Sequence, residues 1–129
     1  MNTEAMHWTT EGSEAGTLRF PEVVKALMDA GVESYRSDLI RGVKTFYMPD
    51  GKIYEEKLTL PTTPVAERFS EPELVAAIRG AQKDEIRYPE FIKRAMTAGT
   101  AGYQVYITGE RAVYVGRKGE VHVEEFPKK

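Results

Sequence analysis

The side chains of this sequence that could do chemistry gather in its last quarter. His122 is one of two histidines, and Glu124 follows two positions later, on the same side of an expected strand. A two-residue turn at 109–110 would place Tyr106 on that face as well. A histidine beside a carboxylate and a phenol could act as a general base oriented by the carboxylate. A half-exposed strand histidine without a catalytic role is commoner, so His122, Tyr106 and Glu124 are candidates and no catalytic residue is assigned.

Two expected hairpin turns sort the C-terminal strands into two faces. Two-residue turns at 109–110 and 118–119 would place Val115 opposite His122 and Tyr114 opposite Val123. The expected core face consists of Tyr103, Val105, Ile107, Ala112, Tyr114, Val121 and Val123. The opposite face is mixed in character, which is typical of sites and interfaces. Its members are Gln104, Tyr106, Thr108, Val113, Val115, His122 and Glu124.

The sequence gives little support for a metal site, for thiol chemistry or for a phosphate-binding loop. There is no cysteine, which excludes disulfides, thiolate metal sites and a cysteine nucleophile. Two histidines cannot supply a common zinc site without carboxylates from distant segments, so no metal and no cofactor are predicted. The Gly116-Arg117-Lys118-Gly119 turn could hold an anion, but it lacks the strand-to-helix setting of a phosphate loop. A plain hairpin turn is favoured there.

Hydrophobic periodicity predicts three helices that would support these strands. Apolar residues from Phe20 to Met28 recur at helical spacing, with Pro21 in the first turn and Gly31 after the end. A second helix begins after the N-cap Ser70 and ends near residue 84. The third begins at Tyr88-Pro89 and is closed by Gly99.

Runs with a period of two predict six strands in two groups. The first group lies at about 35–40, 44–48 and 53–58, and the second at 103–108, 111–115 and 120–126. Because strands are grouped and do not alternate with helices, the fold class is α+β: a helix, a three-stranded antiparallel segment, two helices and a C-terminal three-stranded antiparallel meander. We expect residues 1–17 to form a flexible leader and residues 18–129 to form one domain. Both halves place a Gly-ended helix before strands, which we do not interpret as a duplication.

Charge and hydropathy limit the classes of partner. The 18 basic and 20 acidic side chains give a net charge of −2 and are interspersed, which disfavours nucleic-acid binding. No run of about 20 apolar residues is present to span a bilayer, so no membrane association is predicted. The acidic N-terminal stretch lacks the features of a signal peptide. A cytoplasmic location is the default expectation.

Several segments resemble a known bacterial family, the YdfO-like domains of unknown function, often labelled phage-envelope-protein-like. The resemblance lies in residues 91–103, in Val113-Tyr114-Val115-Gly116-Arg117, in 119–124, in 31–39 and in the hairpin at 46–51. It covers about residues 18 to 127. The resemblance implies an α+β layout and an occurrence in bacteria and prophages, and it assigns no activity, cofactor or catalytic residue.

The sequence therefore favours a non-enzymatic binding or interaction module. A homodimer through a strand edge or through the mixed meander face is one arrangement of such a module. The alternative is a small enzyme or ligand-binding protein that uses the His122, Tyr106 and Glu124 face.

Overall fold

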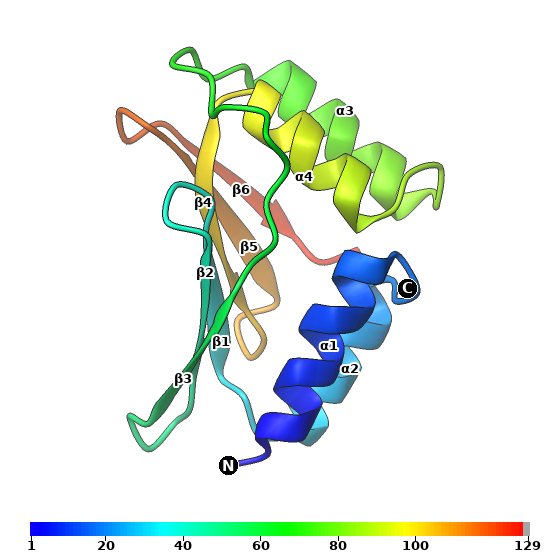
Figure 1. Cartoon of the computed structure of the whole chain (residues 1–129), viewed down its shortest axis with the longest axis vertical. Helices are drawn as coiled ribbons and strands as arrows, with labels where there is room; N and C mark the ends of the chain where they lie inside the picture. Colours follow the sequence, from blue (N-terminus) through cyan, green and yellow to red (C-terminus); the bar gives the residue numbers. More distant parts are fainter. Residues whose placement is uncertain (128–129) are drawn as a thin grey trace.

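Residues 1–127 are described by a computed structural model, in which four helices cover one face of an antiparallel sheet (Figure 1). This is the α+β class that the grouped strands predict. The elements are α1 Thr3–Ala15, α2 Phe20–Asp29, β1 Ser34–Asp38, β2 Val43–Tyr47, β3 Ile53–Lys57, α3 Glu71–Gln82, α4 Tyr88–Thr97, β4 Thr100–Tyr106, β5 Arg111–Gly116 and β6 Val121–Glu125. No helix within residues 1–127 is long and apolar enough to cross a bilayer.

The two groups of strands form one sheet, which the sequence did not predict. The strand order is β3-β2-β1-β4-β5-β6, so the first strand of each group pairs with the other at the centre. In this central pair Ser34 lies opposite Tyr106, and Asp38 lies opposite Gly102. We call the helix-covered side the inner face and the uncovered side the outer face.

The expected flexible leader is wrong: residues 3–15 form helix α1, which packs on the sheet. Its N-cap is Asn2, whose side chain accepts a hydrogen bond from Ala5 N at 3.1 Å. The buried residues of α1 are Met6, Thr9, Thr10 and Ser13, which fall at i, i+3, i+4 and i+7. Three of these four are polar, so a hydrophobic pattern is missing although the helical spacing is present. Both threonine hydroxyls donate to the Met6 carbonyl, which satisfies them inside the core.

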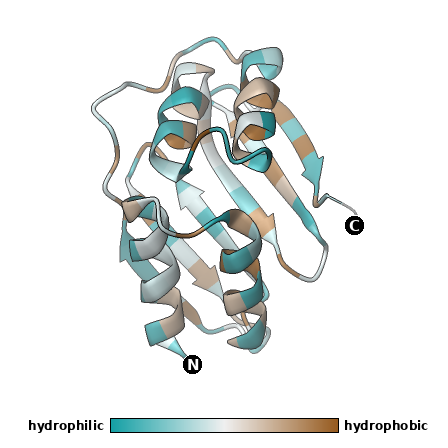
Figure 2. Cartoon of the chain, turned by 90° about the vertical axis from the view of Figure 1, so that its right-hand side faces the viewer, coloured by the Kyte–Doolittle hydropathy of each residue, from teal (hydrophilic) through white to brown (hydrophobic). Residues whose placement is uncertain are grey.

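Helix α1 completes an internal repeat: the order of two helices and three strands occurs twice. A shift of 68 positions, the separation of Gly31 and Gly99, carries α2 onto α4 and β3 onto β6 with the same boundaries. It also carries the N-cap Asn2 onto the N-cap Ser70. Figure 2 shows the result from the helix side, where one pair of helices lies beside the other over the shared sheet. We call residues related by this shift equivalent.

Backbone conformation repeats with the same shift. The residues with positive φ form four equivalent pairs: Gly16 and Asp84, Gly31 and Gly99, Gly42 and Glu110, and Gly51 and Gly119. Such residues reverse the chain after a helix or within a hairpin, where glycine has the lowest steric cost. Gly31 and Gly99, which were predicted to end helices, and Gly119, which was predicted to lie in a hairpin turn, all have positive φ. The faint likeness of the two halves is a full structural repeat.

The core lies between the helices and the inner face. Leu27 and Leu74 from the helix layer and Phe46 and Val105 from the sheet are almost completely buried. Val121 and Val123, which we expected in this core, are instead 53% and 48% exposed on the outer face. The reason is the register of β6, which is described with the site below.

The two helix-ending glycines provide a matched test of how tightly the second repeat is packed. A Cβ on Gly99 would overlap the carbonyl oxygen of Arg68, whereas a Cβ on Gly31 would meet only the end of Met48 at 3.8 Å. We expect Gly31→Ala to lower the free energy of unfolding by about 1–2 kcal/mol, the cost of positive φ for alanine. Gly99→Ala should lower it by about 2–5 kcal/mol, because the backbone must also move. Urea unfolding of both variants measures this, and equal losses would contradict the close approach at Gly99.

Candidate functional site

The register of the last hairpin places His122 on the inner face. Tyr114 lies opposite His122, and Val115 lies opposite Val121, one position away from the predicted pairing. The hairpin loop contains three residues, 117–119, and not two, because Gly116 N donates to Glu120 O across its base. Since alternate side chains of a strand point to opposite faces, this single step exchanges the two faces of β6.

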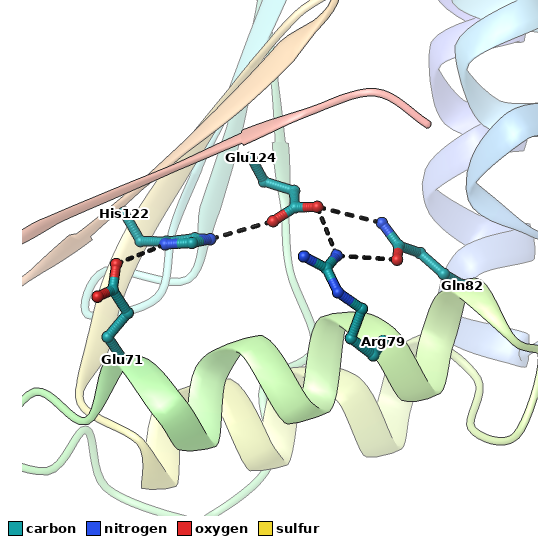
Figure 3. A network of polar contacts seen from close by, with 5 residues as sticks. All are labelled: Glu71, Arg79, Gln82, His122 and Glu124. Atoms are coloured by element: carbon teal, nitrogen blue, oxygen red, sulfur yellow. Dashed lines mark hydrogen bonds and ion pairs between the residues drawn. The ribbon is translucent and has the colours of Figure 1, made fainter. Parts of the chain in front are cut away.

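His122 lies between two carboxylates, one from the sheet and one from the helix layer. Its Nδ1 is 2.7 Å from Glu71 Oε2, at the start of α3, and its Nε2 is 3.1 Å from Glu124 Oε1 (Figure 3). The His122 side chain is only 13% exposed. Each ring nitrogen of His122 therefore faces a carboxylate oxygen, one on α3 and one on β6.

Glu124 is held by α3 on its other side. Arg79 Nη1 donates to Glu124 Oε2 at 2.6 Å, and Gln82 Nε2 donates to the same oxygen at 3.3 Å. Partial burial acts to raise the pKa of Glu124, but the hydrogen bonds from Arg79 and His122 and the charge of Arg79 outweigh it and hold this pKa below its usual value. The ionised carboxylate thus ties strand β6 to helix α3.

The first repeat has a similar tie at the opposite edge of the sheet, made by the equivalent glutamate and by a helix residue at a non-equivalent position. Glu56, the equivalent of Glu124, accepts from Tyr54 Oη at 3.3 Å and lies 2.9 Å from His7 Nδ1 on α1. Tyr54 is itself the equivalent of His122. The hydrogen bond and charge of Glu56 raise the pKa of His7. Because an equivalent glutamate ties each edge strand to the helix layer, the His122 cluster has the geometry of a structural clamp.

Tyr106 does not join His122 and Glu124. It lies at the end of β4 on the outer face, opposite Arg111, and is partly exposed. The predicted trio is therefore divided: Glu124 lies beside His122 as expected, whereas Tyr106 is on the other side of the sheet. The two-residue turn at 109–110 is also wrong, because Val105 lies opposite Ala112 and four residues connect β4 to β5.

One ionisable group lies in the core and was not predicted from the sequence, Lys44. It lies on the inner face of β2 with 3% exposure, and its Nζ is 4.6 Å from the ring centroid of Tyr35 and 5.1 Å from that of Phe46. No ion pair or hydrogen bond of its ammonium is found within residues 1–127. Burial lowers the pKa of Lys44 to about 8, against the opposing attraction of Glu56 and Glu14. The signal was available, since Lys44 is in phase with the apolar Phe46 along one strand.

Further buried polar groups lie between the inner face and the helices. Tyr103 Oη donates to Tyr88 Oη at 3.2 Å, and burial raises the pKa of both phenols. The hydroxyls of Ser37 and Thr100 are buried, and neither has a hydrogen-bond partner within the described chain. The Ser37 hydroxyl is near enough to Tyr103 to lower its pKa slightly, although the geometry is not that of a full hydrogen bond. These groups are enclosed by helices.

The outer face is the accessible side of the sheet, and it carries two hollows. The first, of about 580 Å³, is lined by residues that include Tyr47, Gln104 and Tyr106. The second, of about 600 Å³, is lined by residues that include Arg36, Arg41 and Arg117. The 68-residue shift relates these hollows as well, since it carries Tyr47 onto Val115 and Arg36 onto Gln104, which line the opposite hollows.

The predicted Gly116–Gly119 turn contributes to the second hollow through Arg117 alone. Lys118 is directed elsewhere and pairs with Glu67 at 3.3 Å. Within residues 1–127 no group of three metal-ligating side chains is close enough to hold an ion.

Comparison with known families gives one match. The family described as "Protein of unknown function (DUF1398)" matches residues 9–125, which is most of the chain. The chain belongs to this family. A comparison with curated proteins finds no match. The matched range takes in the second half of α1 and all later elements, so both repeats belong to the family's domain.

The buried Lys44 predicts an alkaline dependence of stability. Its folded-state pKa lies below the unfolded value, so the cost of burying its charge is fully present below pH 8 and disappears as the pH rises toward 10.5. We expect Lys44→Met to raise the free energy of unfolding at pH 7 by about 1–3 kcal/mol. This gain should shrink between pH 8 and 9.5 in paired urea titrations, since tyrosine ionisation cancels in the difference. A variant less stable than the parent at pH 7 would contradict this prediction.

The clamp at Glu124 predicts that the free energy of unfolding falls at acidic pH. Because the folded-state pKa of Glu124 is depressed, its contribution is present above the unfolded pKa and is lost as the pH falls through the folded value. We expect Glu124→Ala to lower the free energy of unfolding by about 1–3 kcal/mol at pH 7. The control is Lys57→Ala, at the exposed outer end of the other edge strand, β3, with a change below about 0.5 kcal/mol. Equal changes in the free energy of unfolding for the two variants, measured by chemical denaturation, would show that the clamp does not contribute to stability.

Proposed function

We propose that this protein is a non-enzymatic interaction module whose contact surface is the outer face of strands β5 and β6. The occupant that we propose for this surface is a second copy of the chain, which gives a homodimer. The observation that carries the proposal is a patch of four valines on this uncovered face: Val113, Val115, Val121 and Val123.

The equivalent surface of the first repeat shows that the fold itself does not require these valines. The residues equivalent to Val113 and Val123 are Thr45 and Glu55, whereas those equivalent to Val115 and Val121 are Tyr47 and Ile53. Polar side chains thus interrupt the apolar surface of the first repeat at two of the four positions. Charges that point outward from an edge strand commonly prevent association of sheets. On β6 the charge of Glu55 is replaced by the apolar Val123, and both Val121 and Val123 are about half exposed. An exposed apolar patch of this kind is typical of an interface.

The patch can pair with a second copy of itself, apolar side chain on apolar side chain and base on acid. Cross-strand neighbours in it are Val113 with Val123, Val115 with Val121, and Arg111 with Glu125. A two-fold axis that runs along the strands, midway between β5 and β6, would place each residue on its cross-strand neighbour in the other copy. Valine then meets valine, and the Arg111 guanidinium meets the Glu125 carboxylate, in a face-to-face packing of sheets about 10 Å apart.

The geometry gives less support to the alternative, a small enzyme built on His122, Tyr106 and Glu124. Tyr106 lies on the outer face, while His122 and Glu124 lie under α3 and are held by Glu71 and Arg79. The prophage-type origin that the YdfO-like resemblance implies, and a cytoplasmic location, remain part of this proposal and are compatible with an interaction module.

Sedimentation equilibrium tests the proposed dimer. We expect the protein to approach twice the mass of one chain, with a dissociation constant of about 10–100 µM, since the patch is small. Val123→Glu, which installs the residue of the equivalent position in the first repeat, should give a monomer. The control is Ile53→Glu, at the equally exposed opposite edge of the outer face, which should leave the dimer intact. A parent protein that is monomeric at 500 µM, or a dimer unaffected by Val123→Glu, would refute the proposal.

Charge reversal distinguishes this packing from other modes of association. Arg111→Glu and Glu125→Arg should each weaken the dimer about tenfold, because like charges then face each other across the two-fold axis. The double variant should restore most of the parent affinity. Dimerisation that tolerates both single changes would indicate an interface elsewhere, such as a β6 edge pairing.

A further inference from the structure

The second hollow on the outer face has the composition of an anion site. It lies where the turn after β1, the start of β4 and the loop after β5 meet. Three arginines line it, Arg36, Arg41 and Arg117, together with one carboxylate, Asp38. Asp38 is turned toward its own loop, where Oδ1 accepts from Ile40 N at 3.0 Å and from Arg41 N at 2.9 Å.

These arginines differ from most others in the protein. Five of the nine arginines form ion pairs with carboxylates: Arg19, Arg79, Arg87, Arg94 and Arg111. Four have no such pair within residues 1–127, and three of those four line the second hollow. The only contact of their guanidinium groups found in the described chain is a long one, from Arg117 Nη1 to Val65 O at 3.5 Å. In a chain of net charge −2, this places unneutralised positive charge at one point on the surface.

The first hollow provides an internal comparison. It has the same backbone frame and nearly the same volume, about 580 against 600 Å³. The residues equivalent to Arg36, Arg41 and Arg117 are Gln104, Gly109 and Pro49, none of which is charged. The charged residues that line the first hollow are Glu33 and Arg111, one of each sign, so they give it no net positive charge. The frame therefore does not dictate the arginines, and their gathering in the second hollow needs another explanation.

We propose that the second hollow binds a small molecule carrying a phosphate monoester. Three guanidinium groups and one carboxylate leave a charge of +2, which a phosphate monoester dianion balances and a single carboxylate does not. Planar guanidinium groups also match the phosphate oxygens in pairs. A hollow of about 600 Å³ has room for more than a phosphate, and its walls include Val65 and Val115, which suit a carbon frame. This site does not depend on self-association, although Val115 belongs both to the valine patch and to the wall of the hollow.

NMR titration tests this site with inorganic phosphate and, separately, glycerol 3-phosphate, at constant ionic strength set with chloride. The reporters are the amides of Gly102 and Gly116 in the second hollow and of Gly109 in the first. We expect saturable shifts at Gly102 and Gly116 with both probes, and tighter binding of glycerol 3-phosphate. Gly109 should not move.

Arginine substitutions assign the binding. Arg36→Gln, which installs the residue of the first hollow, and Arg41→Gln should each weaken phosphate binding about five- to tenfold. The control is Arg68→Gln, the remaining unpaired arginine, which lies outside the hollow and should leave binding unchanged. Shifts that do not saturate, that appear equally at Gly109, or that survive both hollow variants would overturn the proposal. Repeating the titration with monomeric Val123→Glu separates it from the dimer, because phosphate should bind that variant as tightly as the parent.

Discussion

The antiparallel pairing of β1 with β4 is the interaction on which the rest of the structure depends. Each repeat contributes a three-stranded meander with its first strand at the centre, and this one pairing turns two meanders into a six-stranded sheet. It fixes β3 and β6 as the outer edges, and it sets both helix pairs on one face (Figure 1). An isolated three-stranded unit with two helices would leave that central strand as an open edge.

The clamps at the two edges follow from this arrangement. An edge strand has a neighbour on one side only, so side-chain contacts to the helix layer add to its hold on the sheet. Glu56 and Glu124 provide them at equivalent positions, to His7 on α1 and to Arg79 on α3. The cluster around His122, which resembles an acid–base site by composition, is one member of this pair of structural contacts. The repeat thus supplies an internal standard: what both halves share supports the fold, and what only one half has is open to function.

By that standard, the differences between equivalent residues that are open to function lie on the outer face of the second repeat and in the hollow beside it. Val113 and Val123 of the valine patch stand where the first repeat has the polar Thr45 and Glu55, and the residues equivalent to the three arginines of the second hollow are uncharged. One difference is internal, since the buried Lys44 has Ala112 as its equivalent, so the fold does not require a charge there. Lys44 lies on the inner face, enclosed by helices, and acts on stability, whereas the outer face is open to ligands.

Much of the fold is readable from the sequence because it rests on strong local signals. The helices at 20–29, 71–82 and 88–97 show apolar stripes bounded by proline, a cap or glycine, and all three are confirmed. Helix α1 is not readable in this way, because small polar residues fill its buried stripe.

Of the candidate site, the contact between His122 and Glu124 was predicted correctly and the position of Tyr106 was not. Residues i and i+2 of a strand lie on the same face whatever its register with its neighbours. The prediction that His122 and Glu124 lie side by side therefore did not depend on the register. Tyr106 belongs to a different strand, so its position relative to His122 depends on the lengths of the two hairpin loops. These loops contain four and three residues, not two, and no local sequence signal gives these lengths. The pairing of the two strand groups across 70 positions likewise has no local signal.

Native-state hydrogen exchange tests the central seam most directly. If β1 and β4 hold the two repeats together, their amides should exchange only through global unfolding, with the highest free energy of opening in the protein. Amides of the edge strands β3 and β6 should open more readily, by local fraying. The opposite order, in which β1 and β4 amides exchange more easily than those of β2 and β5, would mean that the repeats separate while each stays folded, and it would contradict the dependence of the structure on this pairing.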